Sequence, residues 1–414
     1  MKRKFIIHAA QMVSPIGTKA LRGKDMSKLT ILEDAAVYIE DETIIMTGTT
    51  EEVLKAHKLE AEDEVIDASA KCILPGFVDS HTHFIFGGFR SQEFMDRING
   101  KPYLDILKAG GGIQSTVVST KSSTEEELYA DGCSRLQDML SMGITTVEGK
   151  SGYGLDLATE LKQLRVLQRL NKEHPMDIAI TYLGAHAVPK EYLGAGDKYI
   201  EEIIEKILPV IKKKNLAEFC DVFCEEGVFS LEQSRKLLQA AKKLGFKIKI
   251  HADEMSTLGG AGLGAELGAF SADHLLMASD RDIKVLAASD TIATLLPCTA
   301  FCLKHPYAAG RKMIDEGCAV ALASDFNPGS CFTNSIPLVF ALSVLHMKLT
   351  LEETITALTL NGAAAIGRSD KLGSIEAGKQ ADILFLKTED YGFLVYNTAI
   401  NQVEHVMKKG TIIY

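Results

Sequence analysis

The tripeptide His81-Thr82-His83 is the clearest sign of chemistry in the sequence. Residues i and i+2 of a strand point to the same side, so both imidazoles can face one ion. His251 and Asp325 end two later apolar runs and supply donors of the same kind. Three histidines and one carboxylate suit zinc or another divalent transition metal, and they leave a position for water. The sequence therefore predicts a metal site made of His81, His83, His251 and Asp325.

A metal of this kind lowers the pKa of bound water to about 7, which makes the water a nucleophile at neutral pH. A side chain must then accept the proton and pass it to the leaving group. Glu254 follows His251 by three residues, and His274 ends the next predicted strand. Glu254, His274 and Asp325 are therefore the candidate catalytic residues, and the sequence leaves open which of them acts first.

These polar residues end short apolar runs that alternate with helical stretches. We expect strands at residues 76–83, 145–150, 178–186, 219–225, 247–254, 271–275, 291–297 and 320–325. Helices are expected at residues 125–142, 158–172, 198–213, 231–244, 280–288 and 351–367. This alternation is typical of parallel βαβ units, and eight such units predict a (β/α)₈ barrel. Catalytic residues of such barrels gather at the carboxyl ends of the strands, where His186 also falls.

Both ends of the chain have the patterns of β-structure. The runs 35–40 and 43–48 are joined by the polar turn Asp41-Glu42, and a late strand begins at Ala381. We predict one small β-sandwich domain built from residues 1–71 and 368–414, with the barrel domain spanning residues 72–367. A doubly wound Rossmann sheet is the competing fold, but no G-x-G-x-x-G opens a helix after a first strand.

Composition limits the class of protein. The 414 residues are 46% hydrophobic and carry a net charge of -10, which indicates a globular chain and disfavours a nucleic-acid partner. His8 and Gln11 interrupt the first apolar stretch, which is too short for a signal peptide. No apolar run reaches the roughly 18 residues of a membrane span. We expect a cytoplasmic protein with no membrane partner.

The segment from Pro75 to His83 (PGFVDSHTH), with a later strand-end histidine, a later aspartate and the tail Gly378–Asp382, resembles the amidohydrolase superfamily over nearly the whole chain. This resemblance implies a metal-dependent hydrolase on a (β/α)₈ barrel with a flanking β-sandwich. It also implies that the matching residues bind the metal, namely His81, His83, His251 and Asp325.

Further segments narrow the resemblance to members that open 4-imidazolone-5-propanoate with water, giving N-formimidoyl-L-glutamate in histidine breakdown. These segments cover residues 90–94, 109–113, 150–155, 183–189, 251–254 and 324–330. The resemblance implies that substrate contacts come from Arg90, Tyr153, His186, Glu254, Asn327, Gly329 and Ser330. An arginine fork and a hydroxyl donor are the groups that a substrate carboxylate requires, and Arg90 and Tyr153 supply them.

We expect one metal per chain, zinc or iron. Amidohydrolases of another subtype bridge two metals with a modified lysine on the fourth strand, but residues 219–225 contain no lysine, and Lys150 ends the second strand. In the predicted reaction, Asp325 and His274 orient and deprotonate a water that attacks the ring carbonyl. The metal and His274 stabilise the oxyanion, and Glu254 relays a proton to the leaving nitrogen.

Two other functions compete with this reaction. A mononuclear deaminase of a formimino compound or a nucleobase would share the metal set and the His251/Glu254 pair, but a neutral nucleobase offers no carboxylate to Arg90. A non-catalytic barrel used for assembly would usually lose metal ligands, and all four are present. The resemblance also implies a homodimer.

Overall fold

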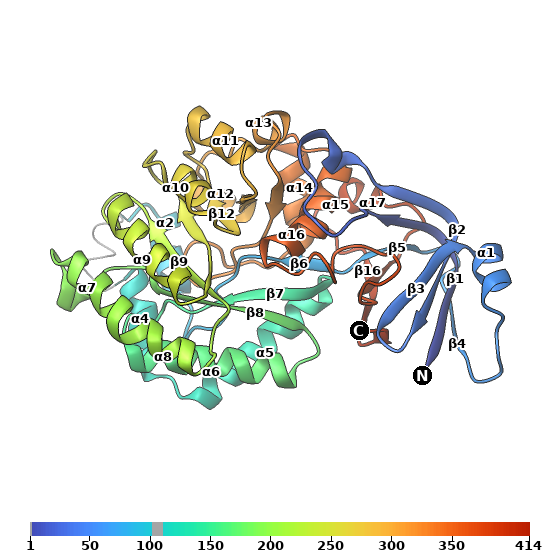
Figure 1. Ribbon diagram of the computed structural model, residues 1–414, viewed down its shortest axis with the longest axis horizontal. Coiled ribbons are helices and arrows are strands. Elements are labelled where there is room, and N and C mark those ends of the chain that lie inside the picture. The colour runs from blue at the N-terminus through green and yellow to red at the C-terminus, as the bar shows by residue number, and fades with distance from the viewer. Residues whose placement is uncertain (1, 102–110) are drawn as a thin grey trace.

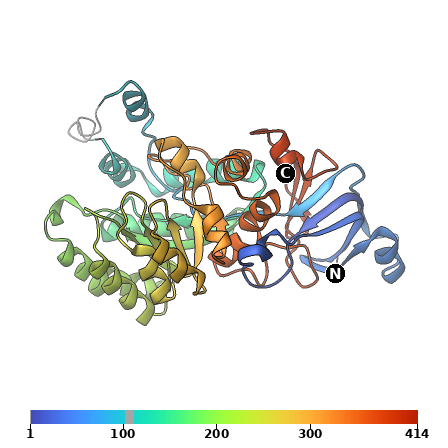
Figure 2. The ribbon, with the colours of Figure 1, turned by 90° about the horizontal axis from the view of Figure 1, so that it is seen from above.

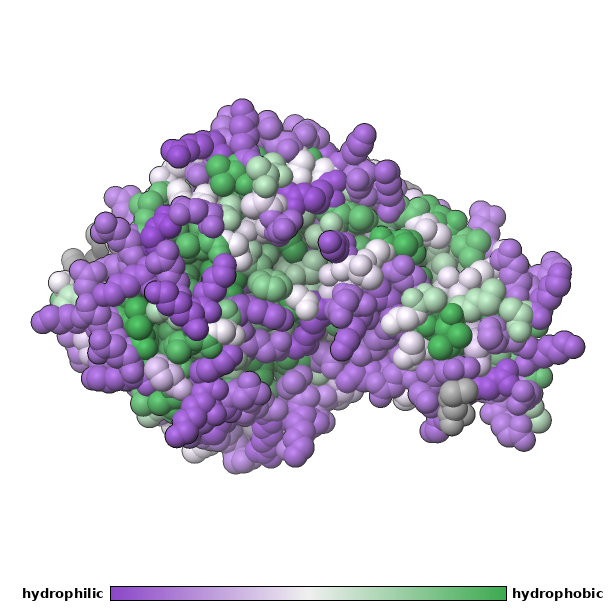
Figure 3. All heavy atoms as spheres, viewed as in Figure 1, coloured by the Kyte–Doolittle hydropathy of each residue, from purple (hydrophilic) through white to green (hydrophobic). Residues whose placement is uncertain are grey.

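The computed structural model describes residues 2–101 and 111–414, and its strands form two sheets that lie beside each other along the long axis of the molecule (Figure 1). The same separation is seen from above in Figure 2. Polar and charged side chains cover most of the face shown in Figure 3, with small apolar patches between them. In the described ranges, no helix is both long enough and apolar enough to cross a membrane.

The larger sheet is the predicted barrel of parallel strands. Its order along the sheet follows the order along the chain, and the short strands β10 and β11 both pair with β9. Its strands are β6 (Phe77–Asp79), β7 (Ile144–Lys150), β8 (Asp177–Ala185), β9 (Phe219–Cys224), β10 (Lys247–Ile248), β11 (Ile250–Ala252), β12 (Ser271–His274), β13 (Ile292–Leu295) and β14 (Val320–Leu322). The predicted fold class, a (β/α)₈ barrel with a small β-domain from both chain ends, is confirmed.

Hydrogen bonds just beyond β6 and β14 bring the first and last barrel strands together. Asp325 N donates to His81 O at 3.0 Å, and His83 N donates to Phe326 O at 2.9 Å. The buried Asp79 carboxylate accepts from Ser324 N at 3.0 Å and from Ser324 Oγ at 2.5 Å. These main-chain hydrogen bonds bring three predicted metal ligands together: His81 and His83, which follow the first barrel strand, and Asp325, which follows the last.

Helices cover the outside of the barrel (Figure 1). The predicted segments 125–142, 158–172, 231–244 and 280–288 are helical, and Thr124 and Ser230 begin two of them with capping boxes. The helices associated with the barrel are α2 (Ser91–Ile98), α4 (Ile113–Ser122), α5 (Glu125–Ser141), α6 (Leu157–Glu173), α7 (Gly196–Glu202), α8 (Leu208–Lys213), α9 (Leu231–Lys243), α10 (Gly260–Leu267), α11 (Asp280–Ala287), α12 (Pro297–Leu303), α13 (Gly310–Asp315), α14 (Ile336–Leu345), α15 (Leu351–Leu358) and α16 (Leu360–Ala365).

Two predicted helices are interrupted. Residues 198–213 contain a π-helical turn at Ile203–Ile207 between α7 and α8. Pro209, which has no N–H to donate, stands at the start of α8, where the regular hydrogen-bond pattern resumes. The stretch 351–367 breaks at Thr359, whose φ and ψ are -123° and -92° and whose hydroxyl donates to Ile355 O at 2.6 Å.

The smaller sheet combines both ends of the chain. It contains β1 (Arg3–Ser14), β2 (Thr30–Glu40), β3 (Thr43–Thr49), β4 (Glu64–Asp67), β5 (Cys72–Pro75), β15 (Ile383–Leu386), β16 (Val403–Lys408) and β17 (Thr411–Ile412), with α1 (Thr50–Ala56) and α17 (Phe393–Tyr396) nearby. Apolar side chains from both ends share one core, for example Ile6, Val37 and Phe385. Because β5 pairs with β1 and β15, this sheet extends past the predicted boundary at residue 71.

A buried ion cluster joins the small domain to the barrel. Lys408 Nζ in β16 lies 2.7 Å from Asp177 Oδ2 at the start of β8 and 2.6 Å from Asp382 Oδ2. The Lys408 side chain is only 1% exposed, and its ammonium group helps to hold the pKa of Asp177 below its usual range despite burial. Removing the ammonium group would leave the Asp382 carboxylate buried without a counter-charge.

We predict that Lys408→Met lowers the free energy of unfolding by about 3–5 kcal/mol, because breaking a buried pair leaves an uncompensated charge. Lys409→Met is the matched control: Lys409 contacts Asp177 at 2.9 Å but is 38% exposed, so its loss should cost about 1 kcal/mol or less. Urea unfolding of both variants is the measurement. Equal losses would mean that the buried position of Lys408 contributes nothing extra.

Candidate metal centre

The four predicted metal ligands converge at the carboxyl end of the barrel. His81 Nε2 and His251 Nε2 lie 3.3 and 3.4 Å from His83 Nε2. Asp325 Oδ1 lies 3.5 Å from His81 Nε2 and 3.6 Å from His83 Nε2. All four side chains are buried. The histidines come from strand ends on both sides of the barrel, so only the closed fold brings them together.

Donor atoms of His81, His83 and His251 lie within 4.8 Å of one another, and so do those of His81, His274 and Asp325. The four distances given above also fit neighbouring ligands of one metal ion. Ligand atoms about 2.0–2.2 Å from a zinc-like ion are separated by roughly 3.3–3.6 Å, which is the range found here. Burial lowers the pKa of His81 and His83 well below the usual range, so both rings are neutral and can offer a lone pair. Burial raises the pKa of Asp325 to about 7, a cost that an adjacent cation would offset. The residues therefore fit a divalent metal.

Two carboxylates behind the histidines orient the rings. Asp273 Oδ2 accepts a hydrogen bond from His81 Nδ1 at 2.6 Å, which leaves Nε2 free to face the ion. Asp221 Oδ2 lies 2.9 Å from His251 Nδ1. Carboxylates in this position fix the ring tautomer and strengthen the ligand, and their loss typically costs 10–100-fold in metal affinity. Sequence reasoning missed both residues, because a lone aspartate in a strand carries no motif.

Two lysines complete a buried ionic layer beneath these carboxylates. Lys150 Nζ lies 2.7 Å from Asp221 Oδ2 and 3.1 Å from Glu148 Oε1, while Lys249 Nζ lies 2.6 Å from Glu148 Oε2. The side chains of Glu148, Lys150, Asp221, Lys249 and Asp273 are all 0% exposed. The sequence did not predict this place for Lys150 among the buried carboxylates.

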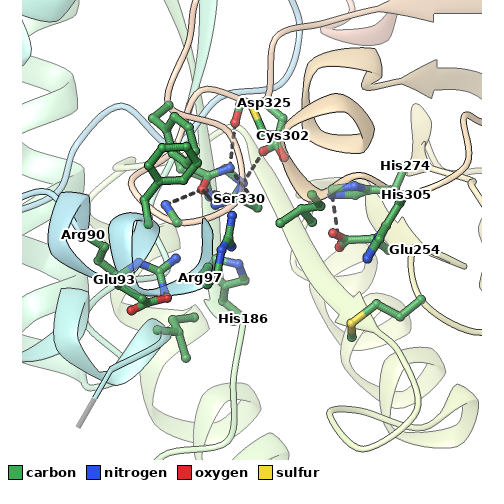
Figure 4. A pocket seen from close by; sticks show the side chains of 18 of the residues that line it. Arg90, Glu93, Arg97, His186, Glu254, His274, Cys302, His305, Asp325 and Ser330 are labelled. Carbon is green, nitrogen blue, oxygen red and sulfur yellow. Dashed lines mark hydrogen bonds and ion pairs between the residues drawn. The ribbon is translucent and has the colours of Figure 1, made fainter. Parts of the chain in front are cut away.

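A cavity of about 960 Å³ opens above the donor cluster, and His83, Arg90, Tyr153, His186, Glu254, His274, Asp325, Asn327, Gly329 and Ser330 are among the residues that line it. Figure 4 shows Arg90 with Glu93 on one wall and Glu254 with His274 on the other. Gly111 also lines it, whereas residues 109 and 110 of the predicted glycine-rich loop lie outside the described residues.

Arg90 lies against the backbone of Gly329. A Cβ added at Gly329 would lie 0.9 Å from Arg90 Nη2, so any larger residue there would displace the guanidinium. Arg90 Nη1 lies 3.5 Å from Glu93 Oε1, and the buried Arg90 Nε has no hydrogen-bond partner among the described residues. The guanidinium is therefore placed at the cavity wall with a donor left for an anionic ligand.

Tyr153 and His186 form a neighbouring part of the wall. Tyr153 is 3% exposed, and the His186 ring stacks on His83 with centroids 5.0 Å apart. Burial lowers the pKa of His186 to about 3, so the ring is neutral. Its Nδ1 lies 3.1 Å from Gly152 O and must carry the proton, which leaves Nε2 as an acceptor. Gly152 has a φ of +112°, a conformation that favours glycine.

Glu254 and His274 face each other across the carboxyl ends of β11 and β12. His274 Nε2 lies 3.6 Å from Glu254 Oε2. Burial, followed by the nearby Asp325 and Glu225 charges, raises the pKa of Glu254 to about 8, so its carboxyl group is protonated at pH 7. His274 has a φ of +79°, and strained backbone of this kind clusters at functional sites. The pair can therefore hold a transferable proton beside the donor cluster.

Asn327 organises the loop that follows Asp325. Its Oδ1 accepts from Gly329 N at 2.9 Å and Ser330 N at 2.8 Å, and its Nδ2 donates to Asp325 O at 2.7 Å. Because these bonds use both ends of the amide, Asn327 shapes the pocket rather than presenting a free polar group. Thr299, which sequence reasoning missed, donates to Asp325 Oδ2 at 2.6 Å and leaves Oδ1 toward the histidines.

Comparison with known proteins places these features in context. The Amidohydrolase family matches residues 72–413. An imidazolonepropionase of Clostridium tetani is 56% identical over 416 residues, covering 100% of this chain and 99% of that protein. An imidazolonepropionase of Parabacteroides distasonis is 55% identical over 409 residues, covering 99% and 98%. Guanine deaminase of E. coli superposes with a TM-score of 0.74 at 14% identity, covering 100% and 99%, which shows the fold alone.

We predict one equivalent of a divalent metal per chain, because the donor atoms of the predicted ligands surround one position. Elemental analysis of protein purified without added metal is the measurement. His251→Ala should lose the metal, and Asp221→Asn should retain it with an affinity about 10–100-fold lower. Two equivalents in the wild-type protein, or full metal retention by His251→Ala, would contradict this ligand set.

Proposed function

The chain belongs to the Amidohydrolase family, and from this premise we propose that it hydrolyses the ring of 4-imidazolone-5-propanoate to N-formimidoyl-L-glutamate in histidine degradation. The observation that carries the proposal is one cavity in which Arg90 and a protonated Glu254 both face a metal-type donor cluster. The imidazolonepropionase relatives at 55–56% identity over nearly the full length support the same reaction. The enzyme is thus a hydrolase acting on a cyclic amide.

His81, His83, His251 and Asp325 would hold the metal, for which we propose zinc or iron. When bound, a metal of this kind lowers the pKa of water and polarises a carbonyl oxygen. Asp273 and Asp221 keep the His81 and His251 rings in the orientation that ligation requires. Thr299 holds one oxygen of Asp325, so that the other oxygen is directed at the cluster.

The substrate is held by its two ends. Arg90 binds the propanoate carboxylate with its guanidinium fork, and the Tyr153 hydroxyl adds a donor nearby. His186 Nε2 accepts from a ring N–H, because its Nδ1 proton is used on Gly152 O. The loop shaped by Asn327, with Gly329 and Ser330, closes the pocket beside Arg90. These contacts place the ring carbonyl over the donor cluster.

The side chains divide the proton transfers between them. Asp325 and His274 orient the attacking water, and Asp325 accepts its proton. His274 therefore stays neutral and donates a hydrogen bond to the oxygen that becomes negative. Glu254, protonated at pH 7, donates to the ring nitrogen as the bond between carbonyl carbon and nitrogen breaks. Water thus supplies one oxygen to the new carboxylate, and the nitrogen leaves with a proton as part of the formimidoyl group.

A metal-dependent deaminase remains the alternative reaction on this fold. The likeness to guanine deaminase at 14% identity concerns the fold, whereas relatives at above 50% identity are imidazolonepropionases. We also propose a cytoplasmic homodimer that acts on a small molecule with a carboxylate side chain, and expect neither a nucleic-acid nor a membrane partner.

The direct test is to incubate the purified metal-loaded protein with freshly prepared 4-imidazolone-5-propanoate. The ultraviolet absorbance of the imidazolone should decay, and N-formimidoyl-L-glutamate should accumulate without ammonia. The His251→Ala protein is the control for spontaneous decay. Stoichiometric ammonia release would support the deaminase reaction instead, and decay at the control rate would contradict hydrolysis by this site.

We predict that Arg90→Met lowers kcat/KM by roughly 30- to 1,000-fold at unchanged metal content, because a charged contact contributes about 2–4 kcal/mol when its partner is left unpaired. Gly329→Ala should lower kcat/KM in the same way by displacing Arg90. If so, the double variant should lose no more than about twofold beyond Arg90→Met. If the fold-loss in kcat/KM of the double variant equals the product of the two single losses, Gly329 acts independently of Arg90.

Glu254→Gln should lower kcat by about 10²–10⁴-fold with metal content unchanged, because an amide cannot transfer the proton. The sign of the pH effect follows from the raised pKa: the acid is protonated below about pH 8, so wild-type kcat should fall as the pH rises through that value. This fall of kcat at high pH, the basic limb of the pH profile, should vanish in Glu254→Gln. A variant that keeps more than a tenth of the wild-type kcat, or loses its metal, would contradict the role.

A further inference from the structure

Glu225, which follows β9, holds the loop that carries Glu254. It is 1% exposed, and its Oε2 accepts from the backbone N–H of Glu254 at 2.9 Å and of Met255 at 3.0 Å. Its other oxygen accepts from Glu226 N at 3.1 Å and from the Ser256 hydroxyl. Four neutral donors therefore converge on one carboxylate outside the metal cluster, and neither the motif analysis nor the proposed reaction assigns it a role.

We propose that Glu225 is a positioning residue that fixes the backbone of Glu254 beside the substrate. The inference rests on the proposed function of Glu254. Without Glu225, two consecutive N–H groups at the edge of the cavity would lose their acceptor, and the loop would lose its link to β9. The other half of the loop is held separately, because Asp253 accepts from Leu258 N, Gly259 N and Ala261 N at 2.7–2.9 Å at the start of α10.

Glu225 also acts on Glu254 through its charge. The groups that face the Glu254 carboxyl are Asp325 beyond β14, Glu225 beyond β9 and His274 at the end of β12. The two neighbouring carboxylates disfavour a second negative charge, and together with burial they raise the pKa of Glu254. A neutral residue at position 225 should therefore let Glu254 ionise at a lower pH. A purely structural support would not move this ionisation.

Hydrogen exchange followed by mass spectrometry tests the positioning without any need for activity. In Glu225→Met, which keeps the side-chain length but removes both acceptor oxygens, the amides of Glu254 and Met255 should exchange at least about tenfold faster. Ser256→Ala, which removes one hydroxyl from the same carboxylate, is the matched control and should leave both amides protected. Unchanged exchange in Glu225→Met would overturn the inference, whatever the fate of the proposed reaction.

The pH profile tests the charge effect. Glu225→Gln should lower kcat by about 10–100-fold and move the basic limb down by at least half a pH unit, with metal content unchanged. Glu225→Asp, which retains the charge on a shorter side chain, should lower kcat but leave the limb in place, and it also serves if the glutamine variant does not fold. A limb that persists in Glu254→Gln would count against the proposed acid. If the limb in Glu225→Gln lies at the same pH as in the wild type, only the charge effect of Glu225 is contradicted, and the proposed role of Glu254 is not.

Discussion

Four carboxylates and two ammonium groups are buried together at the closed end of the pocket, and their charges must be balanced for the barrel to fold around them. Glu148, Asp221 and Asp273 pair with Lys150 and Lys249 in a buried layer, and Asp325 adds a fourth carboxylate in the donor cluster above it. Counted as ionised, they leave two negative charges, which one divalent cation neutralises. Burying unpaired charge is costly, so the metal completes the charge balance of the fold as well as supplying its chemistry.

In the barrel, the charged layer and the reacting groups come from different parts of the strands. Side chains within the strands, such as Glu148 and Asp273, form the buried layer, whereas residues at or just past the strand ends face the cavity. Glu254 and Asp325 illustrate the consequence, since both are carboxylic acids in one pocket but are held for different tasks. Asp325 points one oxygen at the histidines of the donor cluster, while Glu254 faces His274. Environment rather than residue type assigns the roles.

The sequence was sufficient to predict the barrel, the terminal β-domain and the convergence of His81, His83, His251 and Asp325, because strand–helix alternation and strand-end polar residues have recognisable spacing. It could not reveal Asp221, Asp273 or Glu225, since their partners lie on other strands and no local motif marks a residue that supports another. Helix breaks at Ile203–Ile207 and Thr359 were missed for a similar reason, because apolar periodicity continues through them. The close approach of Arg90 to Gly329 is likewise a tertiary feature.

The most direct measurement is the fate of the oxygen atom of water. Hydrolysis of 4-imidazolone-5-propanoate by the metal-loaded enzyme in ¹⁸O-labelled water should place one labelled oxygen in the newly formed carboxylate of N-formimidoyl-L-glutamate, because the water attacks the ring carbonyl. The formimidoyl carbon should carry no label. Label on that carbon, in a product that carries an N-formyl group and a carboxamide in place of the new carboxylate, would show attack at the amidine position and would contradict the account.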